Sequence, residues 1–254
     1  LTHVVPANEM YRSYPYATGS SAVHAEHFTT MAHDVATFTG VKGGLVLDVG
    51  SNDGTLLQGF KRIGYDVCGV EPASNLAKVA SDNGITTFNV FFDQGFADWF
   101  VKDQGQADIV TATNVLTHVD DLDAFLAAVK TVLKPDGWFV VEIYYLMSIV
   151  KDNLWDMIYH EHLTYLTVHT LKDLMERRGF HLAYAQKVPV HGGSLRAYFQ
   201  TGEKPEHFVL QPELVDERDM DLGGFAERVH ETRKEIRRFV RDARKAGKTV
   251  IGYS

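Results

Sequence analysis

The chain has 254 residues, of which 45% are apolar, 23% charged and 11% aromatic, and this composition excludes disordered, collagen-like and disulfide-rich proteins. The net charge of −8 argues against general binding to nucleic acid or to an anionic membrane. No run of residues is long and apolar enough for a membrane helix, and we expect no signal peptide. A single thiol, Cys68, cannot form an internal disulfide, so we expect a reducing, cytoplasmic compartment.

Strands and helices are expected to alternate through the first half of the chain. Short apolar runs predict strands at 45–49, 66–70, 86–92, 107–113 and 138–144. Helical patterns lie around them, at 22–39, 55–63, 74–83, 96–102 and 122–133. This alternation predicts an α/β fold with a doubly wound, mostly parallel sheet.

The second half of the chain has a different pattern. Residues 180–188 and 194–201 are expected to form two closing strands, as an antiparallel pair, after a helix at 170–178. A long charged helix is expected at 225–246, amphipathic and packed along its apolar stripe. Residues 249–254 look like the beginning of another strand.

A glycine-rich turn follows the first expected strand. It reads Asp48-x-Gly50-x-Asn52-x-Gly54, which does not fit the G-x-G-x-x-G spacing of dinucleotide-binding folds and so argues against a dehydrogenase. It resembles the D-x-G-x-G-x-G pattern of class I S-adenosylmethionine (SAM) methyltransferases, with Asn52 at the middle glycine. Glu71, at the end of the second strand, can accept hydrogen bonds from both hydroxyls of a ribose.

The strings at 108–118 and 133–142 resemble the fourth-strand and fifth-strand signatures of the same methyltransferases. The resemblance implies a Rossmann-like fold, SAM as cofactor and S-adenosylhomocysteine as product. It also implies that Asn114 lies at the cofactor, that Asp93 meets the adenine edge and that Phe92 packs on its ring. From the residues alone, a solvated acid and a core aromatic are equally open, as is a Rossmann-like domain with another ligand or none.

The string Tyr159-His-Glu-His-Leu-Thr-Tyr165 is the most unusual in the chain. In an extended segment His160 and His162 would share one face, with Glu161 on the other. Histidine titrates near neutral pH and can act as a general base. The spacing is a weak metal signal, so we expect no metal here, and histidines packed under a loop remain an alternative.

This string resembles the Y-H-E-H-L-S/T-Y motif of nucleotide-sugar 3-C-methyltransferases, which methylate C3 of a 4-keto sugar in deoxysugar biosynthesis. Four further strings agree with that family: Tyr14-Pro-Tyr16 with Ser20 and Ser21, Asn114-Val-Leu-Thr-His118, His191-Gly-Gly-Ser-Leu-Arg196, and residues 247–253. The resemblance implies that His162 is the base that removes the C3 proton. It implies that the substrate is oriented and its enolate stabilised by Glu161, Tyr159, His118 and a tyrosine of the pair Tyr14 and Tyr16.

The same resemblance implies a nucleotide-sugar substrate, TDP-linked, with substrate contacts from Ser20, Ser21, His191 and Arg196. From the residues alone, His191 and Arg196 could equally be a turn residue and a strand-surface arginine, and the early tyrosines could cover a hydrophobic edge. An O- or N-methyltransferase for another small molecule, and a non-catalytic SAM-binding module, remain alternatives.

Two departures from the family concern the ends of the chain. The family carries a cysteine-rich zinc module before this region and a second α/β domain after it, and we expect both to be missing here, so zinc is expected only in the missing module. We divide the chain into an N-terminal substrate-side segment and helix (1–40), a SAM-dependent methyltransferase domain (41–201), a linker with the long charged helix (202–248) and the start of a C-terminal domain (249–254).

Overall fold

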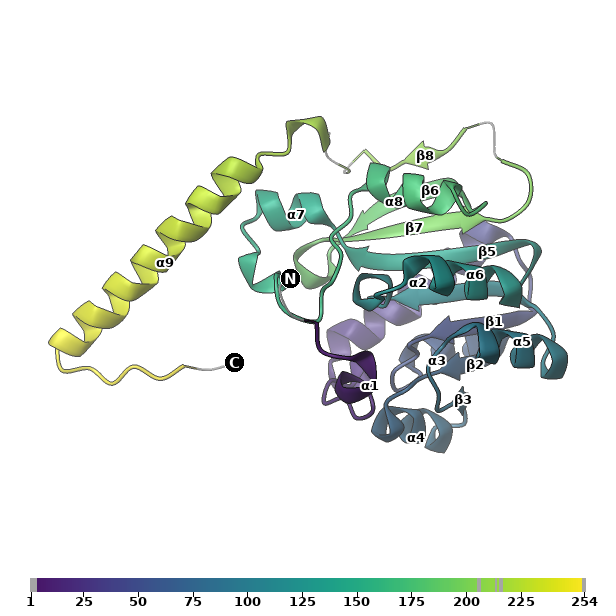
Figure 1. The fold of residues 1–254 in the computed structure, drawn as a ribbon. Coiled ribbons are helices and arrows are strands. Elements are labelled where there is room, and N and C mark those ends of the chain that lie inside the picture. The colour runs from purple at the N-terminus through teal and green to yellow at the C-terminus, as the bar shows by residue number, and fades with distance from the viewer. Residues whose placement is uncertain (1–3, 205–206, 213, 215–216, 253–254) are drawn as a thin grey trace.

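The computed structural model of the chain describes residues 4–204, 207–212, 214 and 217–252, and its centre is a sheet of eight strands (Figure 1). The strand order across the sheet is β3-β2-β1-β4-β5-β7-β6-β8. The strands are β1 (Leu45–Val49), β2 (Asp66–Val70), β3 (Thr86–Phe88), β4 (Ala107–Thr113), β5 (Leu133–Tyr144), β6 (His181–Val188), β7 (Ser194–Gln200) and β8 (Val209–Leu210).

Strands β1 to β5 pair in parallel, and β7 runs antiparallel between β5 and β6. The predicted doubly wound sheet with an antiparallel closing strand is therefore confirmed. The strand order reverses between β1 and β4, so the loops after these two strands diverge and leave a crevice at their carboxyl ends.

Helices cover both faces of the sheet. The helices are α1 (Ala7–Met10), α2 (Ala22–Thr39), α3 (Thr55–Arg62), α4 (Ser74–Asp82), α5 (Gln94–Asp103), α6 (Leu122–Val132), α7 (Leu146–Lys151), α8 (Val168–Glu176) and α9 (Leu222–Lys245). Helices α5, α6 and α8 bury their apolar sides in one cluster, and α2 and α3 bury theirs in a second. Adjacent β1 residues serve opposite faces, because Val46 belongs to the second cluster and Leu47 to the first. Short 3-10 turns lie at Thr18–Ser20, Leu116–His118, Trp155–Met157, Val190–Gly192 and Glu217–Asp219.

The structure differs from several of the sequence-based expectations for individual elements. The third strand ends at Phe88 instead of residue 92, because Asn89 turns away to donate hydrogen bonds to the carbonyls of Glu71 and Pro72. The fifth strand begins earlier than predicted, at Leu133. The short helices α1 and α7 were not predicted. Residues 249–252 form no strand, since no neighbouring strand pairs with them in the described part of the chain, and 253–254 lie outside it.

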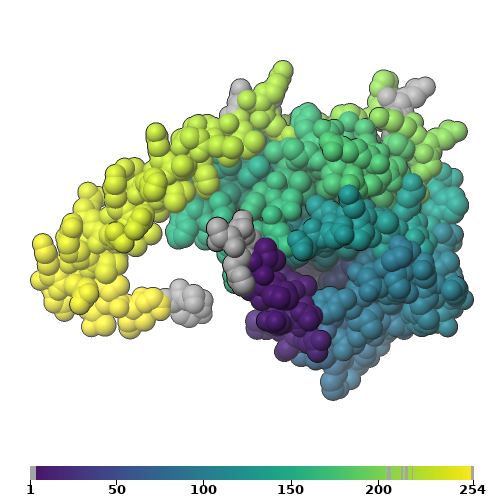
Figure 2. Space-filling model, viewed as in Figure 1, coloured from purple at the N-terminus to yellow at the C-terminus, as the bar shows by residue number. Residues whose placement is uncertain are grey.

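Helix α9 extends away from the body of the molecule (Figures 1 and 2). It has no buried residue, and Phe239 on its apolar stripe is 71% exposed. Its contacts with the body include a bond from Arg228 to the carbonyl of Val150 at 2.7 Å and one from Asn153 to Thr232 at 3.1 Å. The expectation that this stripe is packed is therefore wrong for the described residues. None of the described helices combines the length and apolar character required to cross a membrane.

Candidate functional site

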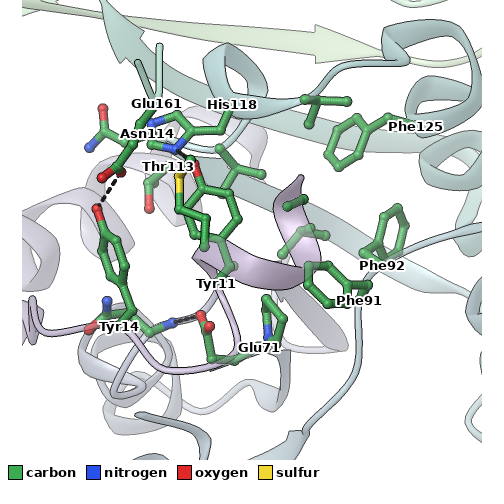
Figure 3. Close-up of a pocket in the computed structure, with 18 of the residues that line it drawn as sticks. Tyr11, Tyr14, Glu71, Phe91, Phe92, Thr113, Asn114, His118, Phe125 and Glu161 are labelled. Atoms are coloured by element: carbon green, nitrogen blue, oxygen red, sulfur yellow. Dashed lines mark hydrogen bonds between the residues drawn. The ribbon is translucent and has the colours of Figure 1, made fainter. Parts of the chain in front are cut away.

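A cavity of about 540 Å³ opens at the carboxyl ends of β1 and β4, where the strand order reverses. Its walls come from the turns after the parallel strands, the N-terminal segment and the His-Glu-His segment (Figure 3). The turns contribute residues 48–52, 71–72, 91–94 and 113–115. A volume of this size suits a cofactor or small molecule.

The turn after β1 depends on left-handed backbone at three positions. Gly50 has φ 68°, and a Cβ there would lie 2.5 Å from a methyl carbon of Val115. Gly54 has φ 80° and precedes α3 as its N-cap. Asn52, where the methyltransferase pattern has glycine, adopts φ 51°, which asparagine tolerates better than most residues. Its side-chain carbonyl accepts a bond from the N–H of Thr18 at 2.9 Å, so it fastens the turn to the N-terminal segment.

Glu71 presents a buried carboxylate to the cavity, with only 6% of the residue exposed. One oxygen accepts a bond from the N–H of Asn52 at 2.9 Å and the other from the N–H of Ala73 at 2.8 Å. Burial raises the pKa of Glu71, and the two N–H groups oppose that shift. Each carboxylate oxygen has a second lone pair, so the group can still accept two hydroxyl protons.

Asp48 near the end of β1 and Asn114 directly after β4 lie on either side of the strand reversal. Thr111 donates a bond of 2.6 Å to Asp48, and burial raises the pKa of Asp48 to about 7. Asn114 has φ 55° and donates its N–H to the carbonyl of Glu142 at 2.7 Å. The side-chain oxygen of Asn114 is buried without a partner among the described residues, as is the hydroxyl of Ser51 in the turn after β1. Both groups are available to a bound ligand.

Aromatic rings form the opposite wall of the cavity (Figure 3). Phe92 lies with its ring centroid 5.5 Å from that of Phe125 and 5.9 Å from that of Phe96. Phe91 lines the same wall. Asp93 reaches the cavity too, but one of its oxygens caps α5 by accepting the N–H of Phe96 at 2.8 Å.

The His-Glu-His segment docks beside the turn that follows β4. The N–H groups of Leu163 and Thr164 donate to the carbonyl of Thr117 at 2.8 and 3.3 Å. The segment is a turn, closed by the N–H of His162 bonding to the carbonyl of Tyr159 at 3.1 Å. The expectation of an extended segment, with His160 and His162 on one face, is therefore wrong.

Because of this turn, the members of the segment have different environments. Tyr159, His160 and Glu161 line the cavity. The Tyr14 hydroxyl donates to Glu161 at 2.9 Å (Figure 3), which joins the N-terminal segment to the cavity wall.

His162 lies behind the cavity wall, is 0% exposed and is not itself a lining residue. Its ring centroid lies 4.1 Å from that of Tyr159 and 4.4 Å from that of Tyr144. Its Nδ1 lies 2.7 Å from the carbonyl oxygen of Met157, and its Nε2 is buried without a partner among the described residues. Burial lowers the pKa of His162. Since a carbonyl only accepts, Nδ1 carries the proton and Nε2 keeps a lone pair.

His118 lines the cavity, and its ring centroid lies 5.0 Å from that of His162. Its Nδ1 is 2.8 Å from the hydroxyl of Tyr11, and its Nε2 has no partner among the described residues. Burial lowers the pKa of His118 to about 4, so the ring is neutral at pH 7.

Of the remaining predicted site residues, the structure brings only some to the cavity. Tyr16 and His191 line the cavity, and both contact His24. The Tyr16 hydroxyl is hydrogen-bonded to His24 at 2.9 Å, and the His191 ring stacks on the His24 ring. Ser20 and Ser21 do not line the cavity. Ser20 donates to the carbonyl of residue 17, and Ser21 caps α2.

Arg196 lies in the sheet, 1% exposed, and does not line the cavity. Its guanidinium is bonded to Glu142 at 2.8 Å and to Asp34 at 3.0 Å. His27 completes the cluster with a bond to Glu142 at 2.8 Å. The charge of Arg196 is thus already paired inside the fold.

Comparison with known proteins shows to which family the chain belongs. Residues 23–185 match the family described as methyltransferase domain, which covers more than half of the chain. The chain belongs to this methyltransferase family. Residues 189–254 also match a family described as C-methyltransferase C-terminal domain.

Individual relatives agree with this family. The C-methyltransferase NovU of Streptomyces niveus is 32% identical over all of this chain, which spans 62% of the length of NovU. A ubiquinone biosynthesis O-methyltransferase of Azorhizobium caulinodans is 31% identical over 47% of this chain and 46% of its own length.

Among solved structures, the fold resembles magnesium protoporphyrin IX methyltransferase of Synechocystis, solved with bound S-adenosylhomocysteine. The TM-score is 0.56 at 13% identity, over 70% of this chain and 84% of that one. The fold is thus that of class I SAM-dependent methyltransferases, which accounts for the antiparallel β7.

The residues present fit SAM, the cofactor of this methyltransferase family. Glu71 offers a ribose diol two acceptor oxygens, and Phe91 and Phe92 offer an adenine ring an aromatic wall. Asp48 offers a carboxyl group to a cationic ligand, and Gly50 leaves room for the ligand to approach the backbone. Within the ranges that the structure describes, no group of three or more His, Cys, Asp or Glu side chains could hold a metal ion.

Tyr144 and Tyr11 line the cavity, and the sequence reasoning placed neither of them in the site. Tyr144 ends β5, and its position at the carboxyl end of a parallel strand could have indicated it. Tyr11 was noted only as one of three early tyrosines, and no sequence pattern says that it bonds to a histidine more than 100 residues away.

Proposed function

We propose that this protein is a SAM-dependent C-methyltransferase that acts at C3 of a nucleotide-linked 4-keto-deoxysugar, with TDP as the nucleotide. The reaction begins with enolisation of the sugar and ends with a new carbon–carbon bond. The match of residues 189–254 to a C-methyltransferase domain, and the likeness to NovU, support carbon as the methyl acceptor.

The observation that carries the proposal is the state of the His162 ring. Its proton is fixed on Nδ1 by the carbonyl of Met157, and the lone pair of Nε2 is unpartnered. A hydrogen next to a ketone is weakly acidic, so C-methylation needs a base of this kind, whereas O-methylation does not need an enolate. We assign the removal of the C3 proton to Nε2 of His162. The ring of Tyr144 or Tyr159 must shift for the sugar to reach it, since both lie between His162 and the cavity.

Neighbouring groups stabilise the enolate that results. His118 and Tyr159 lie on the cavity wall beside His162 and can donate hydrogen bonds to the oxygen at C4. Glu161, held by Tyr14, orients the sugar hydroxyls, and Tyr16 and His191 close the sugar side.

When bound, SAM supplies an electrophilic methyl group on a sulfonium and is converted to S-adenosylhomocysteine. The electron pair of the broken C3–H bond forms the bond from C3 to the methyl carbon, while the methyl–sulfur pair remains on sulfur. The proton stays on His162 until solvent or product removes it. The chain's contribution is therefore to position the two reactants and to hold the proton.

The cavity walls contain no Lys or Arg within the described residues. A diphosphate has a strong need for such partners. We therefore place the sugar ring inside the cavity and the nucleotide outside it. Under this arrangement Ser20, Ser21 and Arg196, which we had expected at the substrate, act on it only indirectly.

Solvent deuterium exchange tests the proposal. The longest native form of the protein is incubated in D₂O with a panel of TDP-4-keto-deoxysugars, first without SAM and then with it. We expect deuterium at C3 in the first case and a product heavier by one methyl group, stable to mild acid, in the second. Because burial lowers the pKa of His162, exchange should persist at pH values below 6.5, the ordinary pKa of histidine.

A His162→Asn variant should lose exchange by about 100-fold to 10,000-fold, which is the range for a general base. His33→Asn, on the exposed side of α2, is the matched control and should exchange normally. Methyl transfer without exchange would instead favour an O- or N-methyltransferase. SAM binding with neither exchange nor transfer would favour a non-catalytic module.

A further inference from the structure

The N-terminal segment brings Tyr11 to the cavity wall, beside His118. The segment lies on the surface of the body (purple in Figure 2), and the Tyr11 ring points toward His118 (Figure 3). It is anchored at α4, where Asn75 accepts the N–H of Tyr14 at 3.0 Å and donates to its carbonyl at 2.7 Å. The carbonyl of Arg12 accepts a further bond, at 3.0 Å, from the N–H of residue 74. Tyr11 is therefore held by backbone contacts on its C-terminal side.

The hydrogen bond between Tyr11 and His118 is 2.8 Å long and joins the hydroxyl to Nδ1. Burial raises the pKa of Tyr11, so its hydroxyl keeps its proton, and the described residues offer that proton no other acceptor. The natural arrangement is that Tyr11 donates and Nδ1 accepts. A neutral imidazole carries one proton, which must then lie on Nε2.

His118 and His162 thus show opposite tautomers. The carbonyl of Met157 fixes the His162 proton on Nδ1, and the hydroxyl of Tyr11 fixes the His118 proton on Nε2. The two rings lie 5.0 Å apart, and both Nε2 atoms are buried without partners in the described part of the chain. One unpartnered nitrogen can accept a proton, and the other can donate a hydrogen bond. An enolisation needs this combination at adjacent atoms of the substrate.

We propose that Tyr11 is a positioning residue that sets the tautomer of His118, so that its Nε2–H donates to the enolate oxygen while Nε2 of His162 accepts the C3 proton. This inference rests on the proposed function, and it adds a residue and a role that the family resemblance did not supply. Tyr11 itself does not touch the reacting atoms. It acts by determining which of its two neutral tautomers the His118 ring adopts.

Without Tyr11, nothing in the described residues holds the proton of His118 on Nε2. Part of the His118 population would then carry its proton on Nδ1. In that form the lone pair of Nε2 faces the enolate oxygen, and the two repel each other. Loss of a complete oxyanion donor costs about 100-fold to 1,000-fold in rate. A donor that is present only part of the time should cost less, so we expect Tyr11→Phe to lower the rate of C3 exchange by about 10-fold to 100-fold. KM should change little, because the substrate ketone is bound before the enolate forms.

The decisive experiment reads the tautomer directly, by proton–nitrogen correlation spectra of the longest native form of the protein with ¹⁵N-labelled histidine. The spectrum of His118→Asn assigns the signal. In the wild type we expect a protonated Nε2 and an unprotonated Nδ1 at His118, and in Tyr11→Phe a mixed signal. Tyr65→Phe, which loses a buried hydroxyl bond to the carbonyl of Val41 far from the cavity, is the matched control. It should keep the wild-type signal and the wild-type exchange rate.

Three outcomes would overturn the inference. The first is a protonated Nδ1 at wild-type His118, and the second is an unchanged tautomer and exchange rate in Tyr11→Phe. The third is a rise in KM and a fall in kcat together with weaker S-adenosylhomocysteine binding, because this would mean that Tyr11 only supports the fold. The tautomer signal needs no substrate. Absence of C3 exchange in the wild type would therefore contradict the proposed function. The tautomer spectra would still show whether Tyr11 sets the tautomer of His118.

Discussion

At the scale of single residues, the cavity is distinguished by its charge. Six lining residues are carboxylic acids, and no Lys or Arg joins them among the described residues; the acids are Asp48, Glu71, Asp93, Asp120, Asp121 and Glu161. SAM carries an ammonium and a sulfonium, so acidic walls attract it. Most of these acids lie at chain turns, where backbone N–H groups can offset their charge, as Asn52 and Ala73 do for Glu71.

Asp48 should make the unliganded protein less stable as the pH rises. Its pKa is 3.8 in a model peptide and about 7 in the fold, because burial penalises the charge. Below 3.8 both states are protonated and there is no penalty. Between these values the unfolded chain releases the proton and the folded chain retains it, so the free energy of unfolding falls, and above 7 the loss is complete.

Asp48→Asn removes this penalty and keeps an acceptor for Thr111. We expect it to raise the free energy of unfolding at pH 8 by more than about 1.4 kcal/mol, the value of one pKa unit. At pH 5 the gain should be smaller. Urea titrations at both pH values measure it, with Asp103→Asn on the exposed end of α5 as a control for the lost charge. An equal gain at both pH values would show that the carboxyl group is not the cause.

At the scale of elements, a buried ion cluster fastens α2 to the sheet. Arg196 on β7 lies between Glu142 on β5 and Asp34 on α2, and His27 on α2 bonds to Glu142. Glu142 is 0% exposed, and its partners lower its pKa against the effect of burial. Such a cluster adds little net stability, but removing one member leaves a buried charge. The cluster holds α2 against β5 at Glu142, two residues before Tyr144, which lines the cavity.

Arg196→Met should cost about 3–5 kcal/mol of folding free energy, because it leaves Glu142 short of a counter-charge. The double variant Arg196→Met with Glu142→Gln should recover much of that loss. Thermal melts of the two variants and the wild type make the comparison. If Arg196→Met melted like the wild type but bound the nucleotide sugar more weakly, Arg196 would be a phosphate ligand and the cluster would not be structural.

At the scale of the whole molecule, the methyltransferase body and α9 are nearly independent. The helix has no buried residue, and apolar side chains such as Phe239 and Ile236 are 71% and 49% exposed. An apolar stripe of this kind is normally covered by protein. The match to a C-methyltransferase C-terminal domain, at residues 189–254, includes β7 and β8 of the body as well as α9.

Removal of residues 222–254 should therefore leave the body folded. We expect the free energy of unfolding to change by less than about 1 kcal/mol, as for surface changes in general, and S-adenosylhomocysteine binding to stay within about threefold. Calorimetry of the truncated and full chains measures both. Aggregation or loss of binding would mean that α9 packs on the body in solution. Phe239→Ser in the full chain is the matched test of the exposed stripe.

The sequence by itself determined the order of the elements and the family. Alternating apolar strands and amphipathic helices are compatible with few folds. The turn from Asp48 to Gly54 restricts the class of cofactor, because its residues at fixed positions must adopt a left-handed backbone. These are local properties, so they can be read along the chain. The sequence also marked His162, Glu161 and Tyr14 as one functional set, through resemblance to a family.

The tertiary structure decided how those residues face one another. The backbone turn that begins at Tyr159 buries His162 and leaves Glu161 on the cavity wall. The hydrophobic pattern of the sequence does not predict this turn. The sequence allowed Arg196 to bind a phosphate, but in the fold its guanidinium is paired with Glu142 on β5 and Asp34 on α2. Tyr11 meets His118 only because the N-terminal segment is anchored at α4. Each of these contacts joins residues far apart in the chain, and their energies depend on burial, which exists only after the fold has formed.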